Sequence, residues 1–254
     1  MDRLINELRE NYLSGHAARV SSAVYADLEA LWPYFDANYP FILALPRTAR
    51  IVEIGSGSGS FLSWLKQKGF TNIVGLDISP EEVERANSRG VPLILADSHD
   101  YLSNASPGSI DLVIAKAVFE HMEKQVGADL VDLARKALSD EGILVLDVPN
   151  MDWLASNHER YMDLTHHIGY TRESMMQMLS LRFDRIDVQG TREAPTSAGS
   201  RIRIKFVKPI AIWLIRSFLR IMGEGAANVL FESRGIIAVA AGNKERSSAG
   251  VASE

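Results

Sequence analysis

Three glycines occupy five positions directly after a short apolar segment that contains one acid. In the sequence VEIGSGSG the glycines are Gly55, Gly57 and Gly59, and the acid is Glu53. A loop of this kind lets the backbone approach a ligand closely, and the free N–H groups of the helix that follows suit an anionic group such as a carboxylate. Glu53 would repel a phosphate beside this loop, whereas it would attract an ammonium or sulfonium group. The segment therefore predicts a ligand that carries positive charge.

The spacing of the glycines argues against two well-defined phosphate-binding loops. A dinucleotide-binding loop needs glycine at position 60, where this chain has Ser60, and a P-loop needs a Gly-Lys-Ser/Thr sequence that does not follow. Two further acids end the next two predicted strands. The carboxylate of Asp77 can accept hydrogen bonds from both hydroxyls of a ribose, and that of Asp97 can accept one from an adenine amine. Together with the charge of Glu53, these acids favour S-adenosylmethionine.

The surrounding elements must bring these side chains to one edge of a sheet. Apolar runs of strand length alternate with helical segments at βαβ spacing, which predicts a parallel sheet covered by helices. The predicted strands are 50–54, NIVGLD, PLILAD, SIDLVIAKA, GILVLDVP, FDRIDVQG and GIIAVAAGNK, and the predicted helices from position 50 onward are 59–68, 80–89, 125–138, 172–180 and 209–222.

The order of these motifs resembles that of the class I, Rossmann-like S-adenosylmethionine-dependent methyltransferases. VEIGSGSG is similar to their first motif, GLDIS and LADS to their second-strand and third-strand acids, and FEHM to the segment after strand four. The resemblance implies an α/β fold with a seven-stranded, mostly parallel sheet, helices on both faces, an antiparallel last strand and a long insertion between the last two strands. It implies S-adenosylmethionine as the cofactor, bound by Glu53, Gly55, Ser56, Gly57, Gly59, Asp77, Ile78, Asp97 and Ser98.

The pattern of elements along the chain also divides it into parts. We expect residues 1–49 to form a helical prefix or lid, with helices at 2–13 and 17–32 and with Pro33 and Pro40 as helix breakers. Residues 50–242 are predicted to form the methyltransferase domain, which contains an insertion at 191–233. The tail 243–254 is predicted to be disordered.

Three histidines follow strands four and five, at the edge of the sheet where ligands bind in such folds. His121 lies in FEHM, and His166 and His167 lie in DLTHHIGY. We predict His121 or His166 as the general base that removes the proton of an acceptor hydroxyl, with Asp163 orienting one histidine of the His166–His167 pair. A structural, hydrogen-bonded histidine is the alternative in each case.

The same segment bears on the substrate and on metals. We expect His167 and Tyr170 to contact the substrate. Two histidines and one aspartate also have the composition of a metal site. No second convergent acid cluster is recognisable in the sequence, and we therefore expect no metal.

Composition and motifs narrow the class of acceptor. The chain has no cysteine, which cytosine C5 methylation requires, and AKAV stands where nucleobase N-methyltransferases have an Asn/Asp-Pro-Pro-aromatic motif. A net charge of -5 agrees with the absence of a nucleic-acid partner. The Asp163, Thr165 and His166 arrangement, followed by YT, resembles a block in methyltransferases from bacterial surface-polysaccharide and glycolipid clusters. We predict O-methylation of a sugar hydroxyl on a lipid-linked or surface glycan, or on a similar small molecule.

Two alternatives to this function stay open at this point. A nicotinamide-dependent oxidoreductase is disfavoured by Ser60 and Asp97. A non-catalytic binding module of the same fold is suggested by the long insertion and by Lys116, which replaces the small or polar residue that the family often has after strand four. Because a lysine would be unfavourable beside a cationic cofactor, we expect Lys116 to point to solvent.

The segment RIRIKFVKPIAIWLIRSFLRIMG, residues 201–223, is basic and strongly apolar. It contains six basic residues and no acid, and residues 209–222 fit a helix that begins at Pro209. The segment is too short and too charged to span a bilayer, and we hypothesise that it lies in a membrane interface, with packing on the domain itself or on a partner subunit as the alternative. We predict a cytoplasmic protein at the inner face of the membrane, and the sequence leaves its oligomeric state open.

Overall fold

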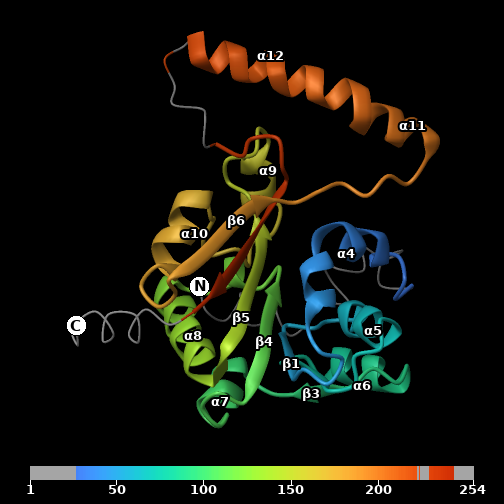
Figure 1. The fold of residues 1–254 in the computed structure, drawn as a ribbon, viewed down its shortest axis with the longest axis vertical. Coiled ribbons are helices and arrows are strands. Elements are labelled where there is room, and N and C mark those ends of the chain that lie inside the picture. Colours follow the sequence, from blue (N-terminus) through green and yellow to red (C-terminus); the bar gives the residue numbers. More distant parts are fainter. Residues whose placement is uncertain (1–26, 222, 224–228, 243–254) are drawn as a thin grey trace.

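A seven-stranded sheet forms the centre of the protein in the computed structural model, which describes residues 27–221, 223 and 229–242 (Figure 1). The strand order is β3-β2-β1-β4-β5-β7-β6. The strands are β1 (Ile51–Ile54), β2 (Ile73–Asp77), β3 (Leu93–Leu95), β4 (Ile110–Lys116), β5 (Leu138–Pro149), β6 (Arg185–Gly190) and β7 (Gly235–Ala241). Strand β7 is antiparallel to both of its neighbours, and the other neighbouring strands are parallel. The predicted α/β fold with an antiparallel last strand is confirmed.

Helices cover both faces of this sheet. They are α4 (Trp32–Asn38), η2 (Pro40–Ala44), α5 (Ser60–Gln67), α6 (Pro80–Ser88), α7 (Ser98–Ser103), η3 (Phe119–His121), α8 (Lys124–Ala137), α9 (Ser156–Tyr161), α10 (Arg172–Leu179), α11 (Ala198–Ile202), η4 (Arg203–Val207) and α12 (Lys208–Ile221). Alternate residues of each buried strand enter two different apolar clusters: Val52 packs with α7, α8 and α10, whereas Ile51 packs with α4, α5 and α6. The short helices α7 and α9 were not predicted.

The segment before β1 packs on the sheet through aromatic residues. Phe35 of α4 makes an edge contact with Phe61 of α5, with ring centroids 5.3 Å apart. Pro33 lies in the first turn of α4 and Pro40 begins η2, so both prolines start helices instead of breaking them, as the fixed φ of proline allows at this position. The predicted helix at 2–13, most of that at 17–32 and the tail 243–254 lie outside the described residues. The division into prefix, domain and tail stays a prediction.

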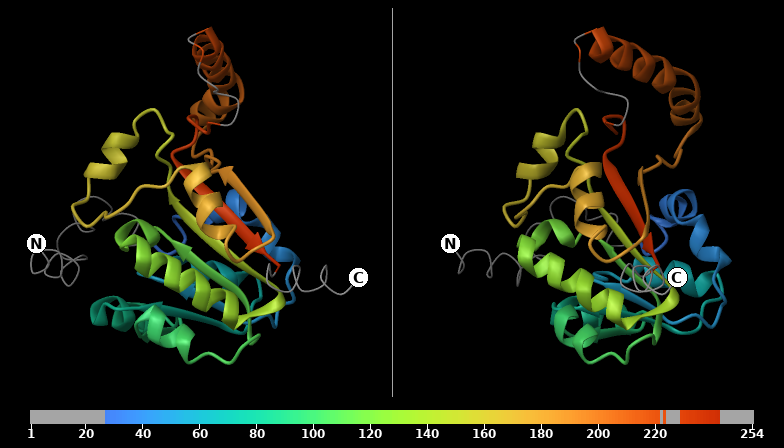
Figure 2. Two further views of the ribbon diagram at one scale, coloured as in Figure 1. Left: turned by 90° about the vertical axis from the view of Figure 1, so that its left-hand side faces the viewer. Right: turned by 60° about the vertical axis from the view of Figure 1, so that its left-hand side comes forward.

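The insertion between β6 and β7 carries a helical run that stands away from the sheet (Figures 1 and 2). The predicted helix 209–222 corresponds to α12 within one residue at each end, whereas the helical structure before it, α11 and the π-helical segment η4, was not predicted. The π-helical segment lies directly before Lys208 and Pro209, and Pro209 has no backbone N–H to donate. None of the residues in α12 is buried, and no described helix is long and apolar enough to cross a membrane.

Candidate functional site

A cavity of about 1210 Å³ opens at the carboxyl ends of the strands. This volume exceeds the roughly 300–1,000 Å³ of a typical ligand pocket, so it has room for a cofactor and an acceptor together. Among the residues predicted from the sequence, those that line the cavity are Glu53, Gly55, Ser56, Gly57, Asp77, Ile78, Asp97, Ser98, His121, His166 and His167. Gly59, Asp163 and Tyr170 do not line it.

The glycine loop after β1 has the backbone that its sequence predicts. Gly55 and Gly57 have φ values of 65° and 50°, which side-chain-bearing residues rarely adopt, and a Cβ at Gly55 would clash with Val118. Gly59 does not line the cavity and instead allows close packing at the start of α5. It caps α5 at a φ of 77°, and a Cβ there would lie 2.7 Å from Val91 Cγ1. Gly55 and Gly57 therefore shape the cavity wall, whereas Gly59 allows the helix to pack closely.

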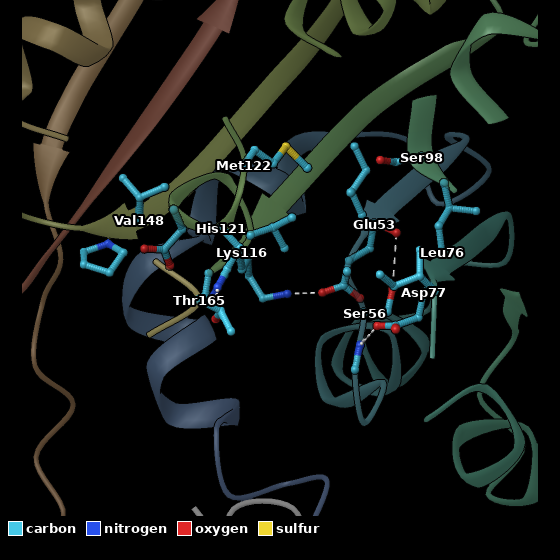
Figure 3. Close-up of a pocket in the computed structure, with 18 of the residues that line it drawn as sticks. Glu53, Ser56, Leu76, Asp77, Ser98, Lys116, His121, Met122, Val148 and Thr165 are labelled. Carbon is cyan, nitrogen blue, oxygen red and sulfur yellow. Dashed lines mark hydrogen bonds and ion pairs between the residues drawn. The ribbon is translucent and has the colours of Figure 1, made fainter. Parts of the chain in front are cut away.

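The two strand-end acids are held by backbone N–H groups. Asp77 Oδ2 accepts a hydrogen bond from the Gly57 N–H at 2.8 Å, and its Oδ1 accepts one from the Ser79 N–H at 2.9 Å (Figure 3). A carboxylate offers about four lone-pair positions, so Asp77 can also accept from two ribose hydroxyls. Asp97 caps α7, with Oδ1 accepting from the His99 N–H at 2.8 Å.

Glu53 and Lys116 form an ion pair in the cavity wall (Figure 3). Lys116 does not point to solvent as expected: its ammonium lies 4.3 Å from the centroid of Phe61 and bonds the carboxylate of Glu53. Burial raises the pKa of Glu53, and the attraction of Lys116 opposes this rise. Oε2 of Glu53 has no partner among the described residues. This atom can accept a hydrogen bond from the ammonium group of a bound amino acid, so the wall fits the methionine part of S-adenosylmethionine.

A fourth acid, Glu82 of α6, lines the same part of the cavity and was missed. The sequence Ser79-Pro80-Glu81-Glu82 has the capping-box pattern, in which the glutamate side chain accepts from the serine N–H. That N–H instead donates to Asp77, and Oε2 of Glu82 is buried with no partner among the described residues. Burial, followed by repulsion from Asp77, raises the pKa of Glu82 to about 7. The sequence pattern therefore suggests a helix-capping role for Glu82, whereas its side chain lines the cavity.

Asp163 orients a different histidine from the one predicted. Thr165 Oγ1 donates to Asp163 Oδ1 at 2.7 Å. His121 Nδ1 lies 2.7 Å from the same hydroxyl oxygen of Thr165 (Figure 3). Because the hydroxyl proton is directed to the carboxylate, the Nδ1 of His121 must be the donor in this contact, which places the lone pair of a neutral ring on Nε2. Asp163 is thus linked to His121 through Thr165.

His166 and His167 are held by their backbone and by the segment 159–161. His166 Nδ1 lies 2.9 Å from the carbonyl oxygen of Glu159, and Arg160 donates to the carbonyl oxygens of His166 and His167 at 2.5 and 2.9 Å. Burial lowers the pKa of His166, and Asp163 partly offsets the effect. A lowered pKa keeps this imidazole neutral near pH 7, as a base or a ligand must be.

Glu120 was also missed, although it precedes His121 in FEHM. It is 3% exposed, and burial raises its pKa to about 8. Its backbone oxygen accepts from the His167 N–H at 2.7 Å, which joins the segment after β4 to the segment after β5. As a result one oxygen of Glu120 and one nitrogen each of His121 and His166 lie within 4.8 Å of one another. Tyr170 instead packs in the core, where burial raises its pKa to about 12.

Two tyrosines from the segment before β1 reach the end of β5. Tyr34 donates to Asp147 Oδ2 at 2.8 Å, and Tyr39 bonds the same oxygen. Asp147 and Tyr34 line the cavity. Burial raises the pKa of Asp147, against the lowering effect of both tyrosines and of Lys116. Nothing in the sequence of this segment indicated Asp147 as the partner of the two tyrosines.

Comparison with known protein families identifies the family of this chain and its cofactor. A family model described as a methyltransferase domain matches residues 28–185. The chain belongs to the methyltransferase domain family. S-adenosylmethionine is accordingly the cofactor, and the glycine loop, the orphaned oxygen of Glu53 and the acids Asp77 and Asp97 fit it.

Individual relatives of this methyltransferase are distant. An S-adenosylmethionine-dependent methyltransferase from Archaeoglobus fulgidus is 20% identical, with a TM-score of 0.65 over 84% of this chain and 94% of that chain. Phosphoethanolamine N-methyltransferase from Plasmodium falciparum is 24% identical over 157 residues, 61% of this chain and 52% of that protein. A polyamine aminopropyltransferase from Xanthomonas euvesicatoria is 29% identical over 123 residues, 42% of this chain and 43% of that protein. The chain spans about half the length of the curated relatives it matches.

Proposed function

We propose that this methyltransferase transfers the methyl group of S-adenosylmethionine to a sugar hydroxyl of a lipid-linked or surface glycan. The observation that carries the proposal is His121, which lines the cavity and is oriented through Thr165 by the buried Asp163. An imidazole held in this way is suited to take the proton of a hydroxyl.

Different residues of the chain would bind the cofactor, remove the proton of the acceptor and hold the acceptor in place. When bound, S-adenosylmethionine supplies an electrophilic methyl group on a sulfonium. The acids Asp77 and Asp97 fix the ribose and adenine, and His121 removes the proton of the acceptor. Arg160 and Arg234 line the cavity beside the histidines. Arg234 is paired with Glu159 and Arg160 donates to two backbone carbonyl oxygens, and their remaining N–H groups can hold a phosphate group of the acceptor.

A second acceptor class is favoured by one comparison. The Plasmodium falciparum relative is named as an N-methyltransferase of phosphoethanolamine, which joins an amine to a phosphate. The same arginines would suit that phosphate, and the same imidazole would take a proton from the ammonium. An amine acceptor is therefore the alternative to a hydroxyl.

Methyl-labelled S-adenosylmethionine distinguishes the two acceptors. The purified protein is incubated with a lipid-linked glycan extract, with free sugars and with phosphoethanolamine, and the labelled products are hydrolysed and identified. We expect an O-methyl sugar and a loss of turnover of about 100-fold or more for His121→Ala, with S-adenosylhomocysteine affinity retained. Label on phosphoethanolamine nitrogen, with none on sugar, would reject the hydroxyl proposal.

We further propose that the helical run 198–221 brings the enzyme to a membrane that carries the acceptor. One stripe of the run exposes large apolar side chains: Phe206, Ile210, Trp213, Leu214, Phe218 and Ile221 are each 55–83% exposed. Its basic residues are partly neutralised, because Arg203 and Lys208 pair with Glu193, and Arg216 pairs with Glu232. Apolar insertion therefore contributes more than attraction to anionic headgroups.

Vesicle flotation tests this contact. We expect co-flotation with anionic vesicles and, because each buried aromatic side chain contributes about 1.5–3 kcal/mol, a loss of at least about 10-fold in bound protein for Trp213→Ser combined with Phe218→Ser. Leu181→Ser is the matched control, since Leu181 is 60% exposed elsewhere on the surface. Equal flotation of the double variant and the wild type, or no flotation of either, would reject membrane contact in favour of a protein partner.

A further inference from the structure

The side chains of Glu120, His121 and His166 converge at the wall of the cavity. One oxygen of Glu120 and one ring nitrogen of each histidine lie within 4.8 Å of one another, and the two imidazole centroids are 4.7 Å apart. Both histidines line the cavity, and Glu120 is buried behind them at 3% exposure. Two adjacent residues after β4 and one residue after β5 therefore form a single cluster.

The hydrogen bonds of the two histidines fix which ring nitrogen carries the lone pair. His121 Nδ1 donates to the hydroxyl of Thr165, whose own proton goes to Asp163. His166 Nδ1 lies 2.9 Å from a backbone carbonyl oxygen, which can only accept. In both rings Nδ1 is thus the protonated nitrogen, and Nε2 of each neutral imidazole is the lone-pair nitrogen. A ring that donates one N–H to a carbonyl or a carboxylate-linked group is the usual arrangement of a metal-binding histidine.

The third member of the cluster has an unsatisfied acceptor. Oε2 of Glu120 is buried and has no hydrogen-bond partner among the described residues. One oxygen of this buried carboxyl group and one nitrogen of each imidazole converge within 4.8 Å, and a cation can satisfy such a set once the carboxyl group has lost its proton.

We propose that Glu120, His121 and His166 bind a divalent transition-metal cation. Two imidazole nitrogens and one carboxylate favour Zn²⁺, Mn²⁺, Fe²⁺ or Ni²⁺ over Ca²⁺ and Mg²⁺, which prefer oxygen ligands. Ligand atoms around a tetrahedral Zn²⁺ are about 3.4 Å apart, so the cluster must contract slightly, and rotation of the half-buried imidazoles provides the movement. Three protein ligands leave a position open toward the cavity for water or an acceptor.

The role of such a cation in catalysis rests on the proposed function. A cation at the cavity wall would bind the oxygen of an acceptor hydroxyl and lower its pKa, and the proton would then pass to water in the open cavity, because the Nε2 lone pair of His121 is used in binding the cation. His121 would then act as a ligand, with Thr165 as a positioning residue. The metal site itself does not depend on the identity of the acceptor.

Direct metal binding tests the site without any measurement of turnover. The full chain is treated with a chelator, dialysed, and titrated calorimetrically with Zn²⁺, Mn²⁺, Ni²⁺ and Mg²⁺. We expect one equivalent of at least one transition metal to bind more tightly than Mg²⁺. Glu120→Gln, which keeps the shape of the side chain, should weaken that binding by more than about 100-fold, and Thr165→Val by roughly 10- to 100-fold, as expected for a residue that orients a ligand.

Two controls distinguish the loss of a metal site from misfolding and from failure of the proposed methyltransferase function. Glu123→Gln changes an exposed acid that lines the same cavity and should leave metal affinity unchanged. S-adenosylhomocysteine titration of every variant reports whether the cofactor half is folded and competent. Normal S-adenosylhomocysteine binding with no transition-metal binding, or with metal binding that Glu120→Gln and His166→Ala both leave intact, would overturn the metal site and leave the methyltransferase proposal standing.

Discussion

Replacement of Glu82 by glutamine should make the protein more stable at alkaline pH. The carboxyl group is 5% exposed, its Oε2 has no partner among the described residues, and burial together with Asp77 raises its pKa to about 7. Between the ordinary glutamate pKa of 4.5 and the folded value, the native state binds more protons than the unfolded state. Stability must therefore fall as the pH rises through this window.

The size of the effect follows from the shift. A rise from 4.5 to about 7 corresponds to at most about 3 kcal/mol in the free energy of unfolding, since one pKa unit equals about 1.4 kcal/mol and solvent in the cavity screens part of the effect. Below pH 4.5 the neutral carboxyl group and the amide should be about equally stable. Above pH 7.5 Glu82→Gln should exceed the wild type by up to about 3 kcal/mol, because the amide carries no buried charge.

Urea unfolding of both proteins at pH values from 4.5 to 8.5 measures this difference. Other buried acids affect both proteins alike, so the difference between wild type and variant isolates Glu82. Glu81→Gln is the matched control: Glu81 is exposed on the same helical turn, and its replacement should change the free energy of unfolding by less than about 0.5 kcal/mol at every pH. A difference between wild type and Glu82→Gln that stays constant with pH would refute the burial of this charge.

Three further predictions concern the cofactor, the base and the loop. Asp77→Ala should weaken S-adenosylhomocysteine binding by about 1.5–3 kcal/mol in calorimetry, because the ribose loses a charged acceptor; unchanged affinity in a folded variant would reject this role. Thr165→Val should lower turnover by roughly 10- to 100-fold and leave cofactor affinity intact, because His121 loses its link to Asp163; unchanged turnover would exclude the relay. Gly59→Ala should cost about 1–3 kcal/mol of stability by thermal unfolding, without changing the affinity of the folded protein, since its φ of 77° strains any side chain.

Local sequence patterns predicted the strands and their parallel arrangement, whereas the seven-stranded sheet with an antiparallel last strand came from the resemblance to class I methyltransferases. Strands such as β1 and β4 are short apolar runs with both faces buried, and the turns between elements are marked by glycine and proline, so their order could be read without tertiary information. The acids Asp77 and Asp97 end strands or begin helices next to the glycine loop. Their place at the cavity follows from the topology, because parallel strands bring their carboxyl ends to one edge. Their part in cofactor binding stays a prediction.

The polar contacts within the cavity could not be predicted in the same way. Thr165 and His121 are joined only because the segments after β4 and β5 lie side by side, with the His167 N–H bonded to the backbone of Glu120. The pairing of Lys116 with Glu53 depends on the register of β4 against β1, in which Glu53 stands opposite Ile114. Such contacts join residues far apart in sequence, and no local periodicity encodes them.

The charges of the cavity wall explain why the glycine loop suits a positively charged ligand and not a diphosphate. Glu53 is balanced by Lys116, but Asp77, Asp97 and Glu82 face the same cavity around the loop. A diphosphate in this position would meet these acids at close range, whereas a sulfonium or ammonium would be attracted by them. Arginines line the cavity only beside the segment that carries His166, among the described residues. The wall therefore favours a cation at the cofactor end, which is the polarity expected for S-adenosylmethionine.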